Sequence, residues 1–368
     1  MTYGTGIHRR FASVLLLAAC AALASCKPNT PAADGDANAN VIVVATYGGG
    51  WAERLQRVTA AEMSARNITV RFVEANAQAA RARLIAARGG PPPFDLMELD
   101  DETYVALSRA DYLERLDLTR IPRTQELIPE LHNEFRVPFW INQPGLIYNA
   151  ERFRAAGIDA PRKLSDFADP RLARRVMLGD LGHYTGLYGL AALIHESGGD
   201  VNNPQPGFDT LARISPHSYF TSATLIGQLF ETGELWAAVS TAAAAQRFHT
   251  SGIEMGIVHL AAVEDRIMVA RGYFGRPRGG RNPEAVAAFI DALISAEAQL
   301  TLSRETGMVP VNRDALREAQ SDQQAGKGYR FSILDEQALA RGYVPPYERI
   351  DLRDWTQRFQ SAVIAQPR

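Results

Sequence analysis

A short apolar run that ends in three consecutive glycines constrains the fold of this chain more than any other stretch. Residues 41–45, VIVVA, are continuously apolar and rich in β-branched side chains, which is typical of a strand buried on both faces of a sheet. Glycines at 48–50 interrupt the run, and beyond them apolar residues recur at helical spacing at Trp51, Leu55 and Val58. The stretch therefore predicts a strand, a glycine turn and a helix, the connection from which α/β sheets are built.

The glycine turn has two interpretations. In an open α/β sheet, ligands bind just beyond the carboxyl ends of the strands, and a helix N-terminus there offers free N–H groups. Tyr47 and Trp51 would then flank a ligand with two aromatic surfaces. Alternatively, this is an ordinary β–α turn with Trp51 in the core, because the glycines match neither the dinucleotide-binding pattern nor the P-loop pattern.

The N-terminus has the pattern of a bacterial lipoprotein signal peptide, which we assign to residues 1–25. A positive start is followed by an apolar run over 11–24, too short to span a bilayer comfortably, and then by Leu-Ala-Ser-Cys, which resembles a lipobox. On that resemblance Cys26 becomes the lipid-bearing first residue. Cys20 ends a similar motif, but it lies within the apolar run, whereas polar residues follow Cys26. The alternative is a soluble secreted protein cleaved nearby.

The composition excludes several classes of function. With 46% apolar and 22% charged residues among 368, and a formal net charge of −2, the chain lacks the basic footprint of a nucleic-acid-binding protein. No GxSxG, HExxH or SxxK motif is present, so nothing pairs a nucleophile with a base, and we expect no enzyme. Both cysteines lie in the signal region, so the mature fold has no disulfide. Residues 26–40 lack large apolar side chains and predict a disordered tether.

From residue 41 onward, strand-like and helical segments alternate, which predicts mainly parallel sheets flanked by helices. A second strand and glycine turn, at 175–186, repeats the design of the opening stretch. Two extended pieces, 137–141 and 145–149, predict a crossing between two lobes. We expect the strand-like residues 253–260 to return the chain to the first lobe, and the polar residues 318–328 to form a loop.

Several motifs occur in a consistent order over roughly residues 41–315. They are TYGG followed by Trp51, GLIYN at 145–149, SDFADP at 165–170, PRGGRN at 277–282, the helix 284–299 and GMVPVN at 307–312. This series resembles the extracellular solute-binding proteins of ABC transporters, and is closest to the spermidine/putrescine-binding-protein-like branch.

The resemblance implies a two-lobed type II periplasmic-binding fold, each lobe a mainly parallel sheet flanked by helices, joined by a two-strand hinge. Lobe 1 would comprise 41–143 and 254–323, lobe 2 would comprise 144–253, and 324–368 would form a C-terminal helical segment. A small molecule would bind in the interlobe cleft, with no cofactor and no metal. The expected partners are ABC permease and ATPase subunits, and the protein is expected to be a monomer, lipid-anchored in the periplasm or cell envelope.

Candidate ligand-binding residues follow the strand ends of both lobes. From lobe 1 they are Tyr47, Gly48, Gly49, Trp51, Asp100 and Asp101. From lobe 2 they are Tyr148, His183, Tyr184, Thr185, Ser240 and Thr241. Structural alternatives stay open: Tyr148 could pack in the hinge, the two aspartates could be solvated helix caps, and Trp140 and Trp236 are expected in the core.

The ligand class is less constrained. Aromatic faces with acids suit an amine or quaternary ammonium, free N–H groups suit a carboxylate or phosphate, and a zwitterion satisfies both. A polyamine-like solute fits the resemblance, although Ala270 and Gly272 stand where polyamine binders of this branch carry a tryptophan and an acid. Two alternatives are a ferric receptor using Tyr47, Tyr148 and Tyr184, and a sensing subunit for a membrane partner.

Overall fold

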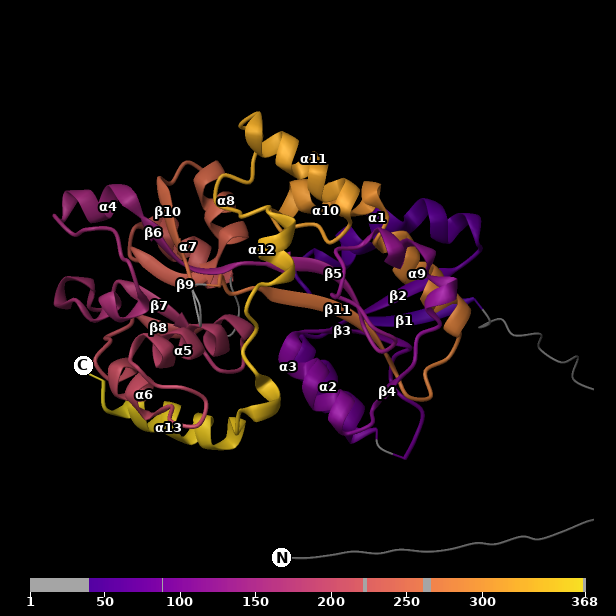
Figure 1. The fold of residues 1–368 in the computed structure, drawn as a ribbon, viewed down its shortest axis with the longest axis horizontal. Coiled ribbons are helices and arrows are strands. Elements are labelled where there is room, and N and C mark those ends of the chain that lie inside the picture. Colours follow the sequence, from indigo (N-terminus) through magenta and orange to yellow (C-terminus); the bar gives the residue numbers. More distant parts are fainter. Residues whose placement is uncertain (1–39, 88, 221–223, 261–265, 367–368) are drawn as a thin grey trace, which may run out of the picture. The chain divides into compact units, whose positions relative to one another are not determined.

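Two β-sheets organise the part of the chain that the computed structural model describes, residues 40–366 without 88, 221–223 and 261–265. The signal peptide, Cys20, Cys26 and nearly all of the expected tether lie outside the described residues. Figure 1 shows the two sheets side by side, each with helices above and below. We call each sheet with its helices a lobe.

Lobe 1 is built on a six-stranded sheet of order β2-β1-β3-β11-β4, with β5 pairing to β11. Its strands are β1 (Val41–Thr46), β2 (Thr69–Glu74), β3 (Leu96–Leu99), β4 (Leu113–Glu114), β5 (Val137–Asn142) and β11 (Ala270–Pro277). Its helices are α1 (Trp51–Ala65), α2 (Ala77–Ala86), α3 (Asp101–Arg109), α9 (Pro283–Leu293), α10 (Ala296–Thr306) and α11 (Arg313–Gln324), with short 3-10 turns η1 (Leu118–Arg120) and η2 (Pro122–Glu126). Helix α1 packs on α9 and α10, and α2 packs on α3 and β3.

Lobe 2 is built on a five-stranded sheet of order β10-β6-β9-β7-β8. Its strands are β6 (Pro144–Asn149), β7 (Val176–Gly179), β8 (Ser218–Phe220), β9 (Ala237–Thr241) and β10 (Met255–His259). Its helices are α4 (Ala150–Ala155), α5 (Tyr184–Glu196), α6 (Gln205–Leu211), α7 (Thr224–Thr232) and α8 (Ala242–Thr250), with 3-10 turns η3 (Leu164–Ala168) and η4 (Pro170–Leu172). The expected two-lobed α/β architecture is confirmed.

The sheets are mixed rather than mainly parallel. Strands joined by helices, such as β1 and β2 or β7 and β9, pair in parallel, because a crossover helix returns the chain to the same edge. Strands that arrive from the other lobe run the opposite way: β5 and β11 are antiparallel to each other, as are β6 and β9. The antiparallel pairs therefore come from the crossing between lobes.

The chain crosses between lobes within three residues. β5 ends at Asn142 in the first sheet, β6 begins at Pro144 in the second, and only Gln143 lies between them. The side chain of Gln143 bonds both backbone groups of Ile333, donating to the carbonyl at 2.5 Å and accepting from the N–H at 2.9 Å. The C-terminal segment is thus fastened to the crossing itself.

This C-terminal segment contacts both lobes. It contains α12 (Glu336–Ala340), η6 (Tyr347–Arg349) and α13 (Leu352–Ile364). In between, Tyr343 forms a parallel bridge with Met268, η6 packs on α3 of lobe 1, and α13 packs on α6 of lobe 2. Figure 1 shows this yellow segment running from the region of the crossing down to α6.

Two expected boundaries are wrong. Residues 255–259 do not return the chain to lobe 1: they form β10, the edge strand of the second sheet, antiparallel to β6 with Gly256 opposite Tyr148. The return comes with β11. Residues 318–324 of the expected loop 318–328 are helical, because α11 continues to Gln324. The side chain of Asn312, the N-cap, accepts hydrogen bonds from the N–H groups of Asp314 and Ala315, and the helix buries only a narrow stripe. The buried residues are Ala315, Leu316, Ala319 and Asp322.

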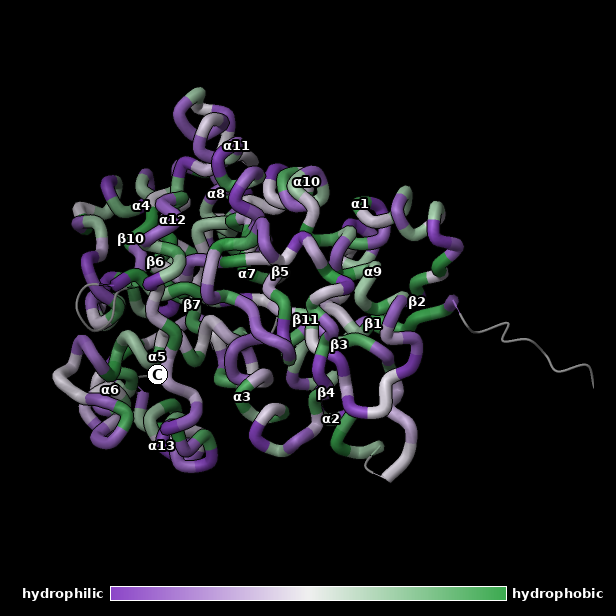
Figure 2. Tube along the Cα trace, turned by 45° about the vertical axis from the view of Figure 1, so that its right-hand side comes forward, coloured by the Kyte–Doolittle hydropathy of each residue, from purple (hydrophilic) through white to green (hydrophobic). Residues whose placement is uncertain are grey.

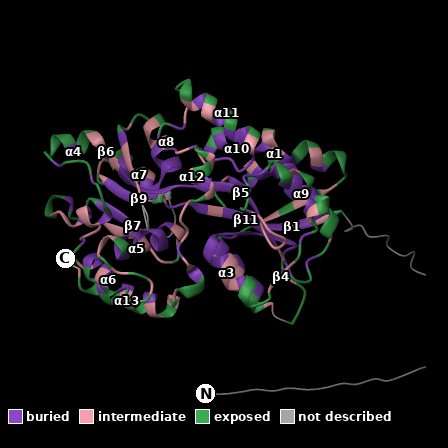
Figure 3. Cartoon of the chain, in the orientation of Figure 1, coloured by how far each residue is buried: buried purple, intermediate pink, exposed green. Residues whose placement is uncertain are grey.

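Apolar residues line the strands of both sheets, whereas α11 and much of α13 are polar or exposed (Figures 2 and 3). In lobe 1, Phe139 of β5 stacks on Phe274 of β11 with ring centroids 4.4 Å apart, and Phe289 of α9 meets Phe274 edge-on. Among the described residues no single helix is both long and apolar enough to cross a membrane; the pair α9 and α10 reaches that length and composition only together, across a bend of 61°.

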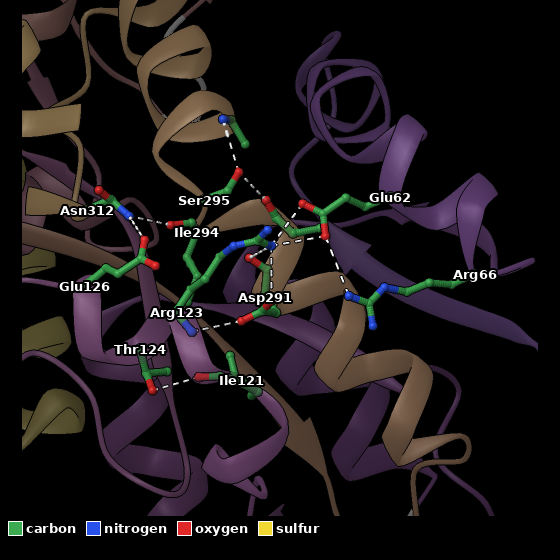
Figure 4. Close-up of polar contacts among 12 residues, drawn as sticks. Glu62, Arg66, Ile121, Arg123, Thr124, Glu126, Asp291, Ile294, Ser295 and Asn312 are labelled. Carbon is green, nitrogen blue, oxygen red and sulfur yellow. Dashed lines mark hydrogen bonds and ion pairs between the residues drawn. The ribbon is translucent and has the colours of Figure 1, made fainter. Parts of the chain in front are cut away.

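A polar network ties η2 to α1 and α9 beneath this core. Asp291 of α9 is 5% exposed and accepts from the backbone N–H and the guanidinium of Arg123, both at 3.0 Å (Figure 4). The same guanidinium also pairs with Glu62 of α1 at 2.9 Å. One arginine therefore joins three elements that are distant in sequence.

Replacing Asp291 with alanine should lower the free energy of unfolding by about 2 kcal/mol, because it leaves the partly buried N–H of Arg123 without an acceptor. The Arg123 side chain is 30% exposed, so water compensates for part of the loss of the ion pair. Urea titration at pH 7 measures the effect. Glu62→Ala, which removes the more exposed partner of the same guanidinium, is the control and should cost less than about 1 kcal/mol. Equal costs for both variants would contradict the assignment.

Candidate functional site

The candidate site lies where the strand ends of the two lobes meet beside the crossing. The carboxyl end of β3 approaches the start of β11, and the carboxyl end of β9 pairs with the start of β6 at Thr241 and Pro144. Two hydrogen bonds join the lobes here. Asn142 Nδ2 donates to Tyr184 Oη at 3.3 Å, and Tyr188 Oη donates to Asp101 Oδ2 at 3.0 Å.

The narrow space between the lobes is lined from three parts of the chain. Lobe 1 contributes Asp100, Asp101 and Trp140, lobe 2 contributes Tyr184 and Tyr188, and the C-terminal segment contributes Tyr347. Tyr347 is 6% exposed, and its ring centroid lies 6.3 Å from that of Tyr188. The interlobe space therefore has a wall that comes from the C-terminal segment.

Glu98, on β3, organises the aromatic wall of lobe 1. Its carboxylate is 1% exposed and accepts from Trp140 Nε1 at 2.8 Å, from Trp51 Nε1 at 3.1 Å and from the Thr46 hydroxyl. Burial raises the pKa of Glu98 to about 7, against the lowering effect of these hydrogen bonds. Because its two oxygens bond both indole N–H groups, Glu98 holds Trp51 and Trp140 in place.

Tyr47 and Asp100 lie next to this wall. Burial, together with the negative charges of Asp100 and Glu98, raises the pKa of Tyr47 well above its usual value, so its hydroxyl is a neutral donor at pH 7. Asp100 caps α3: Oδ1 accepts from the N–H of Thr103 and Oδ2 accepts from Gln78 Nε2, both at 2.8 Å. The structure thus gives Asp100 a capping role and a place beside Tyr47.

Asp101 lies deeper, between the lobes. Its carboxylate accepts from Tyr273 Oη at 2.9 Å and from the N–H of Arg271 at 3.0 Å, in addition to the bond from Tyr188. Burial raises the pKa of Asp101, and the positive charge of Arg271 partly offsets this. Asp101 is therefore occupied by protein donors from both lobes.

Tyr184 carries the lobe 2 side of the site. Its ring lies 6.2 Å from Trp140 across the cleft and 4.8 Å from His183, on which it stacks. Burial raises the pKa of Tyr184 to about 12 and lowers that of His183 to about 4, so both are neutral at pH 7. His183 caps α5, and its Nδ1 lies 2.8 Å from Thr185 Oγ1. These contacts fix the direction in which Tyr184 points.

Asn142 has an unsatisfied oxygen in the same place. The residue is 4% exposed, its Nδ2 donates to Tyr184, and its buried Oδ1 has no hydrogen-bond partner. An orphaned buried carbonyl is costly unless some donor completes it. A ligand N–H group in the cleft would supply that donor.

Arg271 is the arginine that lines the interlobe space itself, and a second cation near Tyr184 is Arg247 of α8. Its side chain is exposed, yet the surrounding protein lowers the pKa of the guanidinium through desolvation, which is expected on the wall of a cleft. The ionisable groups that act on it are Tyr184 and Arg54. No hydrogen bond or ion pair joins Arg247 to a carboxylate among the residues that the structure describes.

The other candidate residues take different places. Gly48 and Gly49 are exposed at the turn before α1, and Gly50 at the helix start has a φ of 80°, which only glycine adopts easily. Trp51 is 8% exposed and packs on Phe139, so it is both a core anchor and part of the wall. The remaining two lie at the end of β9 in lobe 2: Ser240 opposite Gly145, and Thr241 capping α8.

Tyr148 is not brought into this group. It lies four residues along β6 from Pro144, a distance of about 13 Å in a strand, where it packs on Phe153 with centroids 5.1 Å apart. Tyr47, Tyr148 and Tyr184 are therefore not assembled around one point. Among the described residues, no group of three or more His, Cys, Asp or Glu side chains could hold a metal ion.

The sequence reasoning missed Glu98, Arg247 and Tyr347 and placed Trp140 only in the core. Glu98 left a signal, because it is an acid within the apolar strand at 96–99, where a charge needs buried donors. Arg247 and Tyr347 left none, since an arginine on a helix and a tyrosine near the C-terminus are ordinary. Their positions depend on how distant segments pack.

Comparisons with known proteins identify the family of this chain. Residues 56–327 match the family model described as bacterial extracellular solute-binding protein. No curated protein sequence matches the chain.

Solved structures share the fold at low sequence identity. A spermidine/putrescine ABC transporter substrate-binding protein, PotD from Streptococcus pneumoniae, is 16% identical with a TM-score of 0.66, over 88% of this chain and 98% of that one. The periplasmic binding protein MotA from A. tumefaciens B6, in complex with glucopine, is 17% identical with a TM-score of 0.68, over 87% and 99%. AgtB from A. tumefaciens R10, in complex with agropinic acid, is 17% identical with a TM-score of 0.63, over 87% and 98%. The chain belongs to the bacterial extracellular solute-binding proteins, the non-enzymatic substrate-binding components of ABC transporters.

Proposed function

We propose that this protein captures a small amine or zwitterion in the interlobe cleft and delivers it to its membrane permease. As a member of its family it acts outside the cytoplasm, with permease and ATPase subunits as partners. The observation that carries the proposal is the orphaned Oδ1 of Asn142, buried beside Tyr184 in the cleft. A ligand amine would donate to that oxygen and lie near the negative charge of Asp100.

The fold alone does not select this ligand. The same fold occurs in proteins whose structures hold glucopine or agropinic acid and in one named for spermidine and putrescine. The choice rests on side chains of this cleft: Asn142 bonds Tyr184, and Asp100 acts on Tyr184 as a nearby negative charge. A ferric receptor is less well supported, because Tyr148 lies at the far end of β6. A sensing role uses the same cleft, and a neighbouring permease gene would argue for transport.

The charge contribution of Asp100 can be measured. Mass spectrometry of small molecules released from the folded protein should identify an amine, and calorimetry with that compound gives its affinity. Asp100→Asn should weaken binding by about 1.5–3 kcal/mol, because it removes a charge-assisted contact while asparagine still caps α3. Asp351→Asn, the same change at the N-cap of α13, is the control and should bind normally. An amine that binds Asp100→Asn with wild-type affinity would place the amine subsite elsewhere.

We also propose that Cys26 is the first residue of the mature chain and carries lipid, which would hold the protein near its permease. The support is the lipobox-like Leu23-Ala24-Ser25-Cys26 after an apolar run. Intact-mass analysis of protein extracted from membranes should give residues 26–368 with a diacylglyceryl group. Cys26→Ser should abolish the adduct, and Cys20→Ser should not. An unmodified soluble chain, or loss of the adduct only in Cys20→Ser, would refute this assignment.

A further inference from the structure

Arg247 faces lobe 1 from the surface of lobe 2. Its helix, α8, starts beside the crossing and packs against the end of α10: the Cα of Ala243 lies 3.2 Å from where a Cβ on Gly307 would be. Residues four apart lie on the same face of a helix. Arg247 is four residues beyond Ala243, so it projects from the face that meets lobe 1.

Lobe 1 presents further positive charge on this side. Arg54 and Arg57 of α1 share one carboxylate, Glu305 of α10, with nitrogen–oxygen distances of 3.4 Å and 2.5 Å. Arg54 in turn acts on Arg247 as a like charge from across the cleft. One carboxylate thus serves Arg54 and Arg57, and none is bonded to Arg247 within the described part of the chain.

Asp100 is assigned to the ligand amine, and the other acids of the cleft are bonded to protein donors. Glu98 accepts from two indoles, Asp101 accepts from two tyrosines and a backbone N–H, and Glu102 pairs with Arg81. None of them is bonded to Arg247. No carboxylate of the cleft therefore neutralises the positive charge of Arg247. An arginine in this condition can bind an anionic group of a ligand.

Tyr184 supplies a second donor for an anion. Its oxygen accepts from Asn142, which leaves its own proton available, and the hydroxyl is neutral at pH 7. Tyr184 also lies within electrostatic reach of Arg247. A carboxylate between the guanidinium and this hydroxyl would have charge-assisted bonds from both.

We propose that Arg247, together with the Tyr184 hydroxyl, binds an acidic group of the ligand, so that the solute is an amino-acid-like zwitterion rather than a simple amine. This inference rests on the proposed function and adds a subsite to it. The amine end lies at Asn142 and Asp100, and the acid end lies at Arg247. An anion there also screens the repulsion between Arg247 and Arg54, which belong to opposite lobes, and so favours the closed arrangement of the lobes.

The test uses matched probes on the purified full chain. The probes are amino acids paired with the amines formed by their decarboxylation: lysine with cadaverine, ornithine with putrescine, and arginine with agmatine. Thermal shift selects the pairs that bind, and fluorescence titration gives the affinities. The variants are Arg247→Gln and, as a matched control, Arg317→Gln on the exposed face of α11.

The expected result is that lysine, ornithine or arginine binds at least 100-fold more tightly than its decarboxylated partner. Arg247→Gln should weaken binding of that acid at least 30-fold and change binding of the amine less than threefold, while Arg317→Gln changes neither. If amines bind as well as their acids, or if the compound released from the purified protein has no acidic group, the anion subsite is wrong while the receptor function stands. If no probe binds and nothing is released from the protein, the proposed function fails and this inference fails with it.

Discussion

The free energy of unfolding of this protein should fall by about 3 kcal/mol between pH 4.5 and pH 7 through a single side chain, Glu98. Its pKa in the folded state is about 7, raised by burial from an ordinary value of 4.5. Within that window the folded protein keeps a proton that the unfolded chain has released, so stability decreases as the pH rises. A difference of about 2.5 pKa units corresponds to roughly 3 kcal/mol.

The measurement compares urea unfolding of wild type and Glu98→Gln at pH 4.5, 5.5, 6.5 and 7.5. Glutamine imitates the protonated carboxyl and cannot titrate, so the difference in unfolding free energy between the two proteins should change by about 3 kcal/mol across the series. Glu53→Gln, an exposed acid in the first turn of α1, should run parallel to wild type. If the curves of wild type and Glu98→Gln are parallel, the carboxylate has an ordinary pKa and the two indoles keep it ionised.

The same side chain connects stability to the site. Protonation makes the carboxyl group of Glu98 a weaker acceptor for the indole N–H groups of Trp51 and Trp140, which form the aromatic wall. Ligand affinity should therefore vary with pH over the same range in wild type, and less in Glu98→Gln. A receptor outside the cytoplasm meets external pH directly, so this property bears on its working conditions.

The sequence was sufficient for the parts of the fold that depend on local pattern. The apolar run at 41–45 forms β1, the glycines lead into α1, and the extended pieces around residues 142–144 form the crossing between lobes. In each case the period of the apolar residues matches the element that buries them. The order of the motifs predicted the two-lobed fold and the resemblance to solute-binding proteins, and the family match confirms that assignment.

The parts that depend on packing could not be predicted in this way. The strand at 255–259 is recognisable, but its pattern does not show which sheet edge it joins, and it pairs with β6. Helix α11 buries alanines and one leucine, a stripe too weak to stand out in a polar stretch. The path of the C-terminal segment past the hinge, which brings Tyr347 to the cleft, is set by contacts such as Gln143 with Ile333.

The candidate site shows the same division. The strand-end rule selected Tyr47, Asp100, Asp101 and Tyr184, which the structure gathers at the interlobe space. The rule did not distinguish side chains that face the interlobe space from those whose polar atoms are bonded to other protein groups. Asp101 follows Asp100 directly, yet it lies between Tyr188 and Tyr273 rather than beside Tyr47. Asp100 is the extended N-cap of α3 and Asp101 is its first helical residue, so their side chains leave the backbone in different directions, and sequence alone does not orient the helix.

Asp101 gives the prediction with the largest expected effect. Asp101→Ala should lower the free energy of unfolding by about 3–5 kcal/mol, because it removes the buried carboxylate that two tyrosines and a backbone N–H share. Tyr273 Oη and the N–H of Arg271 would lose their acceptor, whereas Tyr188 can still donate to the carbonyl of Val269 at 2.7 Å. Arg271, beside it, would be left as a half-buried cation without the nearby charge of Asp101.

The variant should also weaken the contact between lobes, since Asp101 belongs to α3 of lobe 1 and Tyr188 to α5 of lobe 2. Tyr188→Phe is the matched partner: it removes only the bond that spans the lobes and should cost about 1 kcal/mol. Small-angle scattering without ligand should then give a larger radius of gyration for both variants than for wild type, while only Asp101→Ala loses several kcal/mol in urea. If Asp101→Ala is destabilised but keeps the wild-type scattering profile, the carboxylate supports lobe 1 alone and the interlobe bond is incidental. If Tyr188→Phe opens the molecule as far as Asp101→Ala does, the hydrogen bond from the Tyr188 hydroxyl accounts for the contact between the lobes. The bonds of Asp101 to Tyr273 and Arg271 then stabilise lobe 1.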